Sequence, residues 1–190
     1  MSKPVVGGNR RVDKVLAAGF LDGLAEMSLD ELRDRRREAD QEEADLSYLR
    51  RMLHGRLDIV RAEIEQRANP GEGNLVERLA TILADPDRGV RGSGRHMTAQ
   101  PSRVDEHRRR VEQVIADAVV SDVTHRSDDE LAQAVVDLCA HEAEVSEVRR
   151  EVQQVADALG GELTRRYREG LASVDDVLAR AQGSSASATE

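Results

Sequence analysis

The chain has 190 residues, of which 34% are charged and 2% are aromatic, and its formal net charge at pH 7 is −9. Aromatic side chains anchor most compact cores, so this composition favours long amphipathic helices packed along a narrow seam. The acidic charge excludes non-specific binding to nucleic acid or an anionic membrane through the global field, and no apolar run reaches the ~20 residues that a bilayer requires. These numbers predict an all-α protein that makes no direct contact with DNA or a membrane.

The N-terminal part, residues 1–27, is expected to be a disordered stretch followed by a short helix. Residues 1–10 (MSKPVVGGNR) are polar and lack the apolar core of a signal peptide. Residues 11–26 are amphipathic but contain two glycines, and we predict a short helix that caps the remaining structure. A partner-binding segment is the alternative. With a single cysteine, Cys139, the chain cannot form an internal disulfide, and we expect a cytoplasmic protein.

A first long helix is predicted over residues 29–68. The stretch Met27–Leu32 (MSLDEL) is a capping box with a hydrophobic staple, in which Ser28 is the N-cap and Glu31 follows three residues later. Asn-Pro-Gly at 69–71 ends the helix. A helix this long needs a packing partner. Its apolar positions repeat every seven residues at Leu32, Ala39, Leu46, Leu53 and Val60, with Leu49, Leu57 and Ile64 beside them.

A connector, residues 69–127, is predicted to join this helix to a second one. Short helices are expected at 74–84 and from Ser102 to about 120, separated by a flexible loop rich in Gly, Ser and Arg. A second capping box begins at Ser127, so the second long helix is predicted over residues 128–169.

The C-terminal end of the second helix is marked by glycines. Gly160 and Gly161 are expected to kink it, and Gly170 to end it. A short helix is predicted over 173–181, followed by a disordered tail at 183–190. The helical hairpin as a whole is expected to span residues 28–182.

The two long helices are an internal repeat with an offset of 99 residues. Both carry E-x3-S-x2-R-x3-Q/H-x3-D, a spacing that places all five side chains in one row along a helix, about 100° from the seam. One polar row is normally a solvated face, but two rows at the same distance from a capping box indicate duplication with retained chemistry. Glu63 and Arg67 also align with Glu162 and Arg166. The rows consist of Glu43, Ser47, Arg50, His54 and Asp58, and of Glu142, Ser146, Arg149, Gln153 and Asp157.

An antiparallel pairing of the two helices would bring both rows to one face. We therefore predict an elongated antiparallel two-helix coiled-coil hairpin with short accessory helices. Arginine forks suit phosphate or guanine O6 and N7, and a carboxylate suits the Watson–Crick edge of guanine. A pseudo-symmetric, guanine-containing, doubly phosphorylated ligand would match such a surface.

The duplicated motif resembles the signature of the RsiG family of actinobacterial anti-sigma factors. The resemblance implies binding of cyclic di-GMP as a regulatory ligand, as a dimer of the dinucleotide, and inhibition of a WhiG-type sporulation or flagellar-class sigma factor. Arg50 and Arg149 would contact guanine or phosphate, and Asp58 and Asp157 guanine edges. The departure is His54, where the family motif has Gln. The other site residues implied are Glu43, Ser47, Glu142, Ser146 and Gln153. We expect a monomer before the partner binds.

Other readings of these residues are weaker. Cys139 and His141 do not share one helical face and lack a second pair, so we expect no metal. Exposed rows offer no oxyanion hole, so we expect no enzyme. Acidic neighbours offset the basic clusters at 35–37 and 108–110, which argues against DNA contact. The serious alternative is a ligand-free coiled-coil scaffold or adaptor with solvated polar rows.

Overall fold

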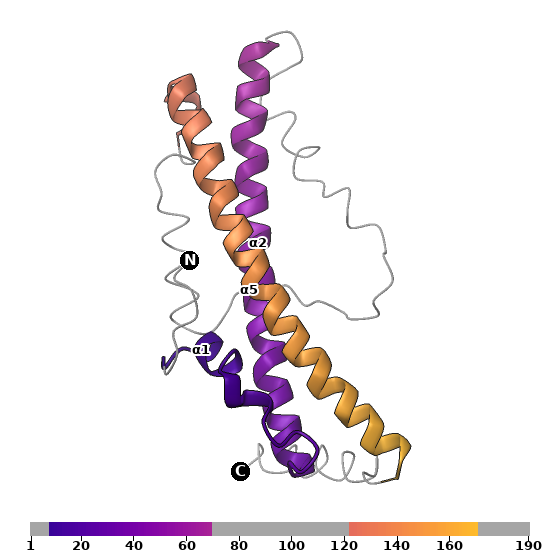
Figure 1. Ribbon diagram of the computed structural model, residues 1–190. Helices are drawn as coiled ribbons and strands as arrows, with labels where there is room; N and C mark the ends of the chain where they lie inside the picture. Colours follow the sequence, from indigo (N-terminus) through magenta and orange to yellow (C-terminus); the bar gives the residue numbers. More distant parts are fainter. Residues whose placement is uncertain (1–7, 70–121, 171–190) are drawn as a thin grey trace, which may run out of the picture. The chain divides into compact units, whose positions relative to one another are not determined.

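The computed structural model describes residues 8–69 and 122–170, which form helices and, within those ranges, no strand (Figure 1). This confirms the predicted all-α class. No helix in the described ranges is both long enough and apolar enough to cross a bilayer. In chain order the elements are α1 (Arg11–Val15), the 3-10 helix η1 (Ala18–Leu21), α2 (Leu29–Ala68), the 3-10 helix η3 (Val123–His125) and α5 (Asp128–Arg168).

The described residues belong to two compact units, and both long helices contribute to each unit. One unit contains residues 43–69 and 122–150, and the other contains residues 8–42 and 151–170. Within each unit the segments of α2 and α5 run antiparallel, because contacts join higher-numbered residues of α2 to lower-numbered residues of α5. The predicted helical hairpin is therefore confirmed.

Both long helices begin at their predicted capping boxes. The Ser28 hydroxyl accepts a hydrogen bond from Glu31 N at 3.2 Å. The second box is reciprocal: Glu130 N donates to Ser127 Oγ at 3.3 Å, and Ser127 N donates to Glu130 Oε2 at 2.8 Å. The Ser127 N–H and the Ser127 hydroxyl both donate to the Glu130 carboxylate, and these two bonds lower the pKa of Glu130. Past the end of α5, Gly170 has a φ of 69°, a left-handed conformation that glycine adopts without strain.

The seam between the helices is built from the predicted heptad positions. The five heptad residues of α2 are at most 1% exposed. On α5, Val152 and Leu159 are fully buried, and Val145 is almost so. Ile64 departs from the prediction, with 37% of its surface exposed. Val60, one turn earlier, is buried in a core cluster with Val123, Leu131 and Ala134.

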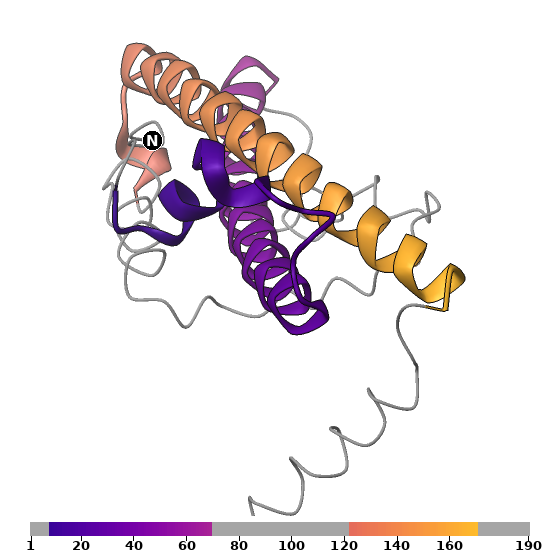
Figure 2. The same ribbon diagram turned by 60° about the horizontal axis from the view of Figure 1, so that its bottom comes forward.

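The N-terminal segment is less regular than predicted. The expected helix over 11–26 is wrong in extent: α1 ends at Val15, and η1 follows after the extended residue Ala17. Gly23 then takes a left-handed conformation (φ 65°), which breaks helical geometry. Figure 2 shows this segment, in indigo, beside α2, where Arg35 donates to the Phe20 carbonyl and its guanidinium lies 5.5 Å from the Phe20 ring centre.

Helix α5 is helical through Gly160 and Gly161. Gly160 is buried, and a Cβ there would overlap the Arg36 guanidinium of α2. The absence of a side chain at Gly160 therefore leaves room for the Arg36 guanidinium. The short helices predicted at 74–84, from Ser102 and at 173–181 lie outside the described residues. So do the predicted disordered tail at 183–190 and residues 1–7 of the disordered stretch predicted at 1–10.

Candidate functional site

The two polar rows lie on α2 and α5, and eight of their ten residues fall in one compact unit. Gln153 and Asp157 lie further along α5, in the other unit. The eight residues of the first unit are Glu43, Ser47, Arg50, His54, Asp58, Glu142, Ser146 and Arg149.

Glu43 joins its own helix to α5. Its Oε1 atom accepts a hydrogen bond from Ser47 Oγ, one turn further along α2, at 2.9 Å. The same oxygen accepts from Arg149 Nη1 of α5 at 2.9 Å. One carboxylate oxygen thus binds the serine of its own motif and the arginine of the other motif.

Glu142 repeats this arrangement from α5. Its Oε1 accepts from Ser146 Oγ at 2.6 Å and from Arg50 Nε of α2 at 3.1 Å. His54 Nε2 lies 3.1 Å from the same oxygen, and since a carboxylate only accepts, the proton must sit on Nε2. The bond from Ser146 lowers the pKa of Glu142 most, Arg50 and His54 lower it further, and burial opposes them.

The motif glutamates and Ser47 are more buried than Arg50 and His54. The side chains of Glu43 and Glu142 are 15% and 21% exposed, whereas those of Arg50 and His54 are 41% and 46% exposed. Ser47 is buried. Any ligand approaching this face would therefore meet Arg50 and His54 before the glutamates.

The aspartates at the ends of the motifs differ in setting. Asp58 is half-buried, and within the described part of the chain no side chain forms an ion pair or hydrogen bond with it. Asp157 is exposed and Gln153 half-buried on α5. Asp58 therefore has acceptor capacity for a ligand.

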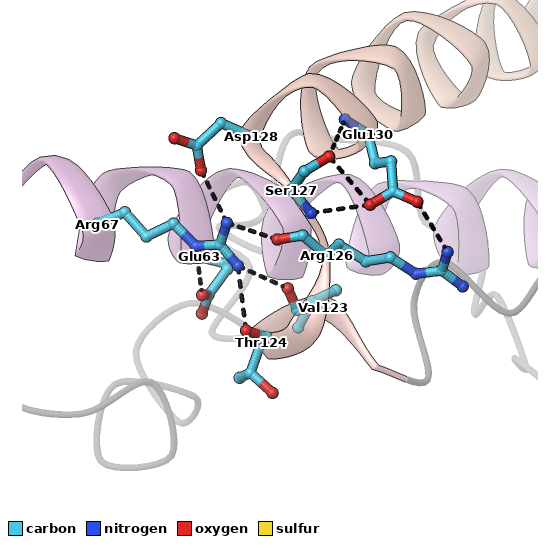
Figure 3. A network of polar contacts seen from close by, with 8 residues as sticks. All are labelled: Glu63, Arg67, Val123, Thr124, Arg126, Ser127, Asp128 and Glu130. Atoms are coloured by element: carbon cyan, nitrogen blue, oxygen red, sulfur yellow. Dashed lines mark hydrogen bonds and ion pairs between the residues drawn. The ribbon is translucent and has the colours of Figure 1, made fainter.

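A second repeated feature lies near the C-terminal end of α2, where Arg67 uses all three of its nitrogens (Figure 3). Its Nε donates to Glu63 Oε1 at 2.8 Å, in the same helix. Nη1 donates to Asp128 Oδ1 and to a backbone carbonyl at 2.7 Å each. Nη2 donates to two further carbonyls. The three carbonyls belong to Val123, Thr124 and Arg126.

Arg166 of α5 makes the equivalent contacts in the other unit. Its Nε donates to Glu162 Oε1 at 2.8 Å, Nη1 to Met27 O at 2.6 Å, and Nη2 to Leu24 O and Ala25 O at 3.0 and 3.1 Å. Each of these three carbonyls lies 99 residues before its counterpart around Arg67, and Glu162 lies 99 residues after Glu63. We call these two sets of contacts the arginine clamps. The alignment of Glu63 and Arg67 with Glu162 and Arg166 was visible in the sequence, but their backbone acceptors were not.

Cys139 and His141 do not act together. Cys139 Sγ accepts a contact from Arg61 Nη2 at 3.6 Å, while His141 Nδ1 lies 2.9 Å from the Asp137 carbonyl. Within residues 8–69 and 122–170, no group of three or more His, Cys, Asp or Glu is placed to hold a metal ion.

The fold and these contacts define a duplicated helical hairpin, in which each motif supplies the carboxylate for the other motif's arginine. The model of the RsiG-like family matches residues 18–83 and again residues 117–182. The matches begin at 18 and 117, 99 residues apart, which is the offset of the internal repeat. The chain therefore belongs to the RsiG-like family. Membership places it in the anti-sigma factor class and implies a sigma factor as its partner. No curated protein matches the chain.

Proposed function

We propose that this protein is an anti-sigma factor that binds cyclic di-GMP on its duplicated motifs and, in the ligand-bound form, holds a WhiG-type sigma factor inactive, so regulating sporulation and development. The observation that carries the proposal is the reciprocal pairing of Glu43 with Arg149 and of Glu142 with Arg50. This pairing joins each motif arginine to the glutamate of the other motif.

The chemistry of guanine suits the residues of these motifs. Guanine presents O6 and N7 as acceptors, which an arginine binds with two parallel N–H groups, each good pair contributing roughly 1–3 kcal/mol of discrimination. The opposite edge of guanine presents N–H donors, which a carboxylate such as Asp58 accepts. On α5 the second motif contains residues of the same kinds, Arg149, Gln153 and Asp157. A pseudo-symmetric dimer of cyclic di-GMP therefore finds matching groups on both helices.

The ligand would lie between the hairpin and the sigma factor and contact both. The free protein is expected to be a cytoplasmic monomer that does not touch DNA itself. Because the chain is acidic, with a net charge of −9, it would need these local contacts to hold an anionic dinucleotide.

The test is a calorimetric titration of the purified protein with cyclic di-GMP, with cyclic di-AMP as the comparison, because the two share phosphates and differ in their bases. Wild type should bind only the guanine dinucleotide, and Arg50→Ala and Arg149→Ala should each bind it more weakly than wild type does. Arg37→Ala is the matched control, since Arg37 lies on α2 with 77% of its side chain exposed. Unchanged binding in both motif variants, or none in wild type, would overturn the proposal.

A ligand-free scaffold is the second candidate, and one observation favours it. The motif glutamates and arginines are already paired with each other, so the rows need no ligand to satisfy these charges. Gel filtration with a WhiG-type sigma factor separates the two functions. Co-elution only in the presence of cyclic di-GMP supports the proposed switch, whereas equal co-elution without ligand supports the scaffold.

A further inference from the structure

We propose that Glu43 and Glu142 are positioning residues rather than ligand contacts: each fixes and charge-compensates the arginine of the other motif, so that the arginines bind the neutral edge of guanine rather than phosphate. This inference rests on the proposed binding of cyclic di-GMP. It assigns separate tasks to residues that the motif presents as one row.

The first argument is that one carboxylate oxygen of each glutamate already accepts hydrogen bonds from other residues of the protein. Glu142 Oε1 already accepts from Ser146, Arg50 and His54. Glu43 Oε1 already accepts from two motif residues. Because both carboxylates are mostly covered, a ligand would have to displace these bonds to reach the bonded oxygens.

The second argument concerns the free edge of Arg50. Only its Nε atom is bonded, to Glu142, and neither Nη atom donates to another side chain or carbonyl of the described residues. The guanidinium is planar, so holding Nε restricts the plane of both Nη groups. Arg50 is therefore oriented by Glu142 while its outer N–H groups remain available to a ligand. Arg149 is held through Nη1 instead, so the two half-sites are not identical.

The third argument is electrostatic. The lowered pKa of Glu142 keeps it ionised at neutral pH, so it offsets the charge of Arg50. A compensated arginine attracts a phosphate less than an isolated one does, but its N–H groups can still bind neutral acceptors such as guanine O6 and N7. We therefore expect the affinity for cyclic di-GMP to depend weakly on salt.

A double-mutant cycle tests the positioning role. Glu142→Gln should weaken cyclic di-GMP binding about tenfold, the scale of one charge-assisted hydrogen bond. In the Arg50→Ala background it should cause no further loss, because the group that it positions is gone. Glu147→Gln, an exposed glutamate of α5, is the matched control and should bind like wild type. Additive losses in the double variant would show that Glu142 contacts the ligand and would overturn the inference.

Two further measurements separate this inference from the proposed function. In the ligand-free protein, NMR should show the Arg50 Nε–H protected from exchange in wild type and unprotected in Glu142→Ala; equal protection would overturn the positioning role. A steep fall in wild-type affinity with salt would place the arginines on phosphate and overturn the guanine assignment. If wild type binds no cyclic di-GMP, the proposed function fails and this inference fails with it. If wild type binds and the cycle is additive, only the inference fails.

Discussion

Arg67 and Arg166 donate hydrogen bonds to equivalent atoms 99 residues apart, each holding the turn that precedes the other long helix. Backbone carbonyls of a partly buried turn need donors. A single guanidinium supplies them here because it carries five N–H groups in one plane. The clamps therefore fix where each long helix begins relative to the end of the other.

Removal of the clamps should destabilise the fold unequally. Arg166→Met should lower the free energy of unfolding by about 2–4 kcal/mol, because buried carbonyls and Glu162 lose their partner. Arg67→Met should lower the free energy of unfolding by less. The Arg67 side chain is 27% exposed against 9% for Arg166, so water can replace part of its contacts. Urea unfolding followed by circular dichroism measures both. A larger loss in Arg67→Met would contradict the role of burial.

Lysine should not rescue the clamp. Arg166→Lys keeps the charge but replaces the planar fork with one ammonium group, which cannot reach three carbonyls and a carboxylate at once. Its unfolding midpoint is expected to lie nearer that of Arg166→Met than that of wild type. A midpoint equal to that of wild type would show that charge alone is sufficient.

Glu162 should make stability depend on acid pH. Hydrogen bonds from Arg165 and Arg166 lower its pKa from 4.5 to about 2 in the folded protein. A depressed folded pKa gives stabilisation that is complete above the unfolded value and is lost as the pH falls through the folded value. Glu162→Gln should therefore have a lower Tm than wild type at neutral pH, and the difference should narrow between pH 4.5 and about 2. A constant difference across this range would show that the carboxylate charge contributes nothing.

The adjacent glycines of α5 should respond differently to alanine. Gly161→Ala is expected to raise the free energy of unfolding by about 0.5–1 kcal/mol, because it adds helix propensity and nothing lies within 4 Å of the new Cβ. Gly160→Ala should gain less or lose stability, since the Arg36 guanidinium must move away. Urea unfolding midpoints of the two variants check this. An equal rise in both would show that the Arg36 side chain can move away without loss of stability.

His54→Gln should preserve ligand binding. A glutamine amide can donate to Glu142 Oε1 as the His54 Nε2–H does, so we expect an affinity for cyclic di-GMP within about threefold of wild type. Calorimetry on His54→Gln and His54→Leu makes the comparison, with the leucine variant expected to bind more weakly. Equal binding in both would show that the hydrogen bond of His54 to Glu142 is not needed.

The sequence predicted those parts of the fold that depend on local chemistry. Ser28 and Ser127 were recognisable as N-caps because their boxes require particular residues at fixed spacing. The buried positions of α2 followed from a seven-residue period. Ile64 lies seven residues after the buried Leu57, yet 37% of its surface is exposed, because a seven-residue period does not specify what packs opposite each position.

The candidate site was only partly predictable. Sequence spacing placed each motif in one row, but it could not show which side chains of a row bond to each other inside the protein. The burial of Ser47 and the bonds from Arg50 to Glu142 depend on how α2 and α5 align. The arginine clamps could not be predicted for a similar reason. Their acceptors are backbone carbonyl groups, which every residue carries, so no sequence pattern marks them.

Each motif glutamate binds the arginine of the other helix, and this pairing constrains how the sequences of the two motifs can diverge. Loss of Glu43 would remove one acceptor of Arg149, although Arg149 belongs to the other copy, and loss of Glu142 would remove the acceptor of Arg50 Nε. Substitutions in one motif therefore affect contacts made by the other motif. Substitutions at these positions should be tolerated mainly when a change in one helix is matched by a change in the other.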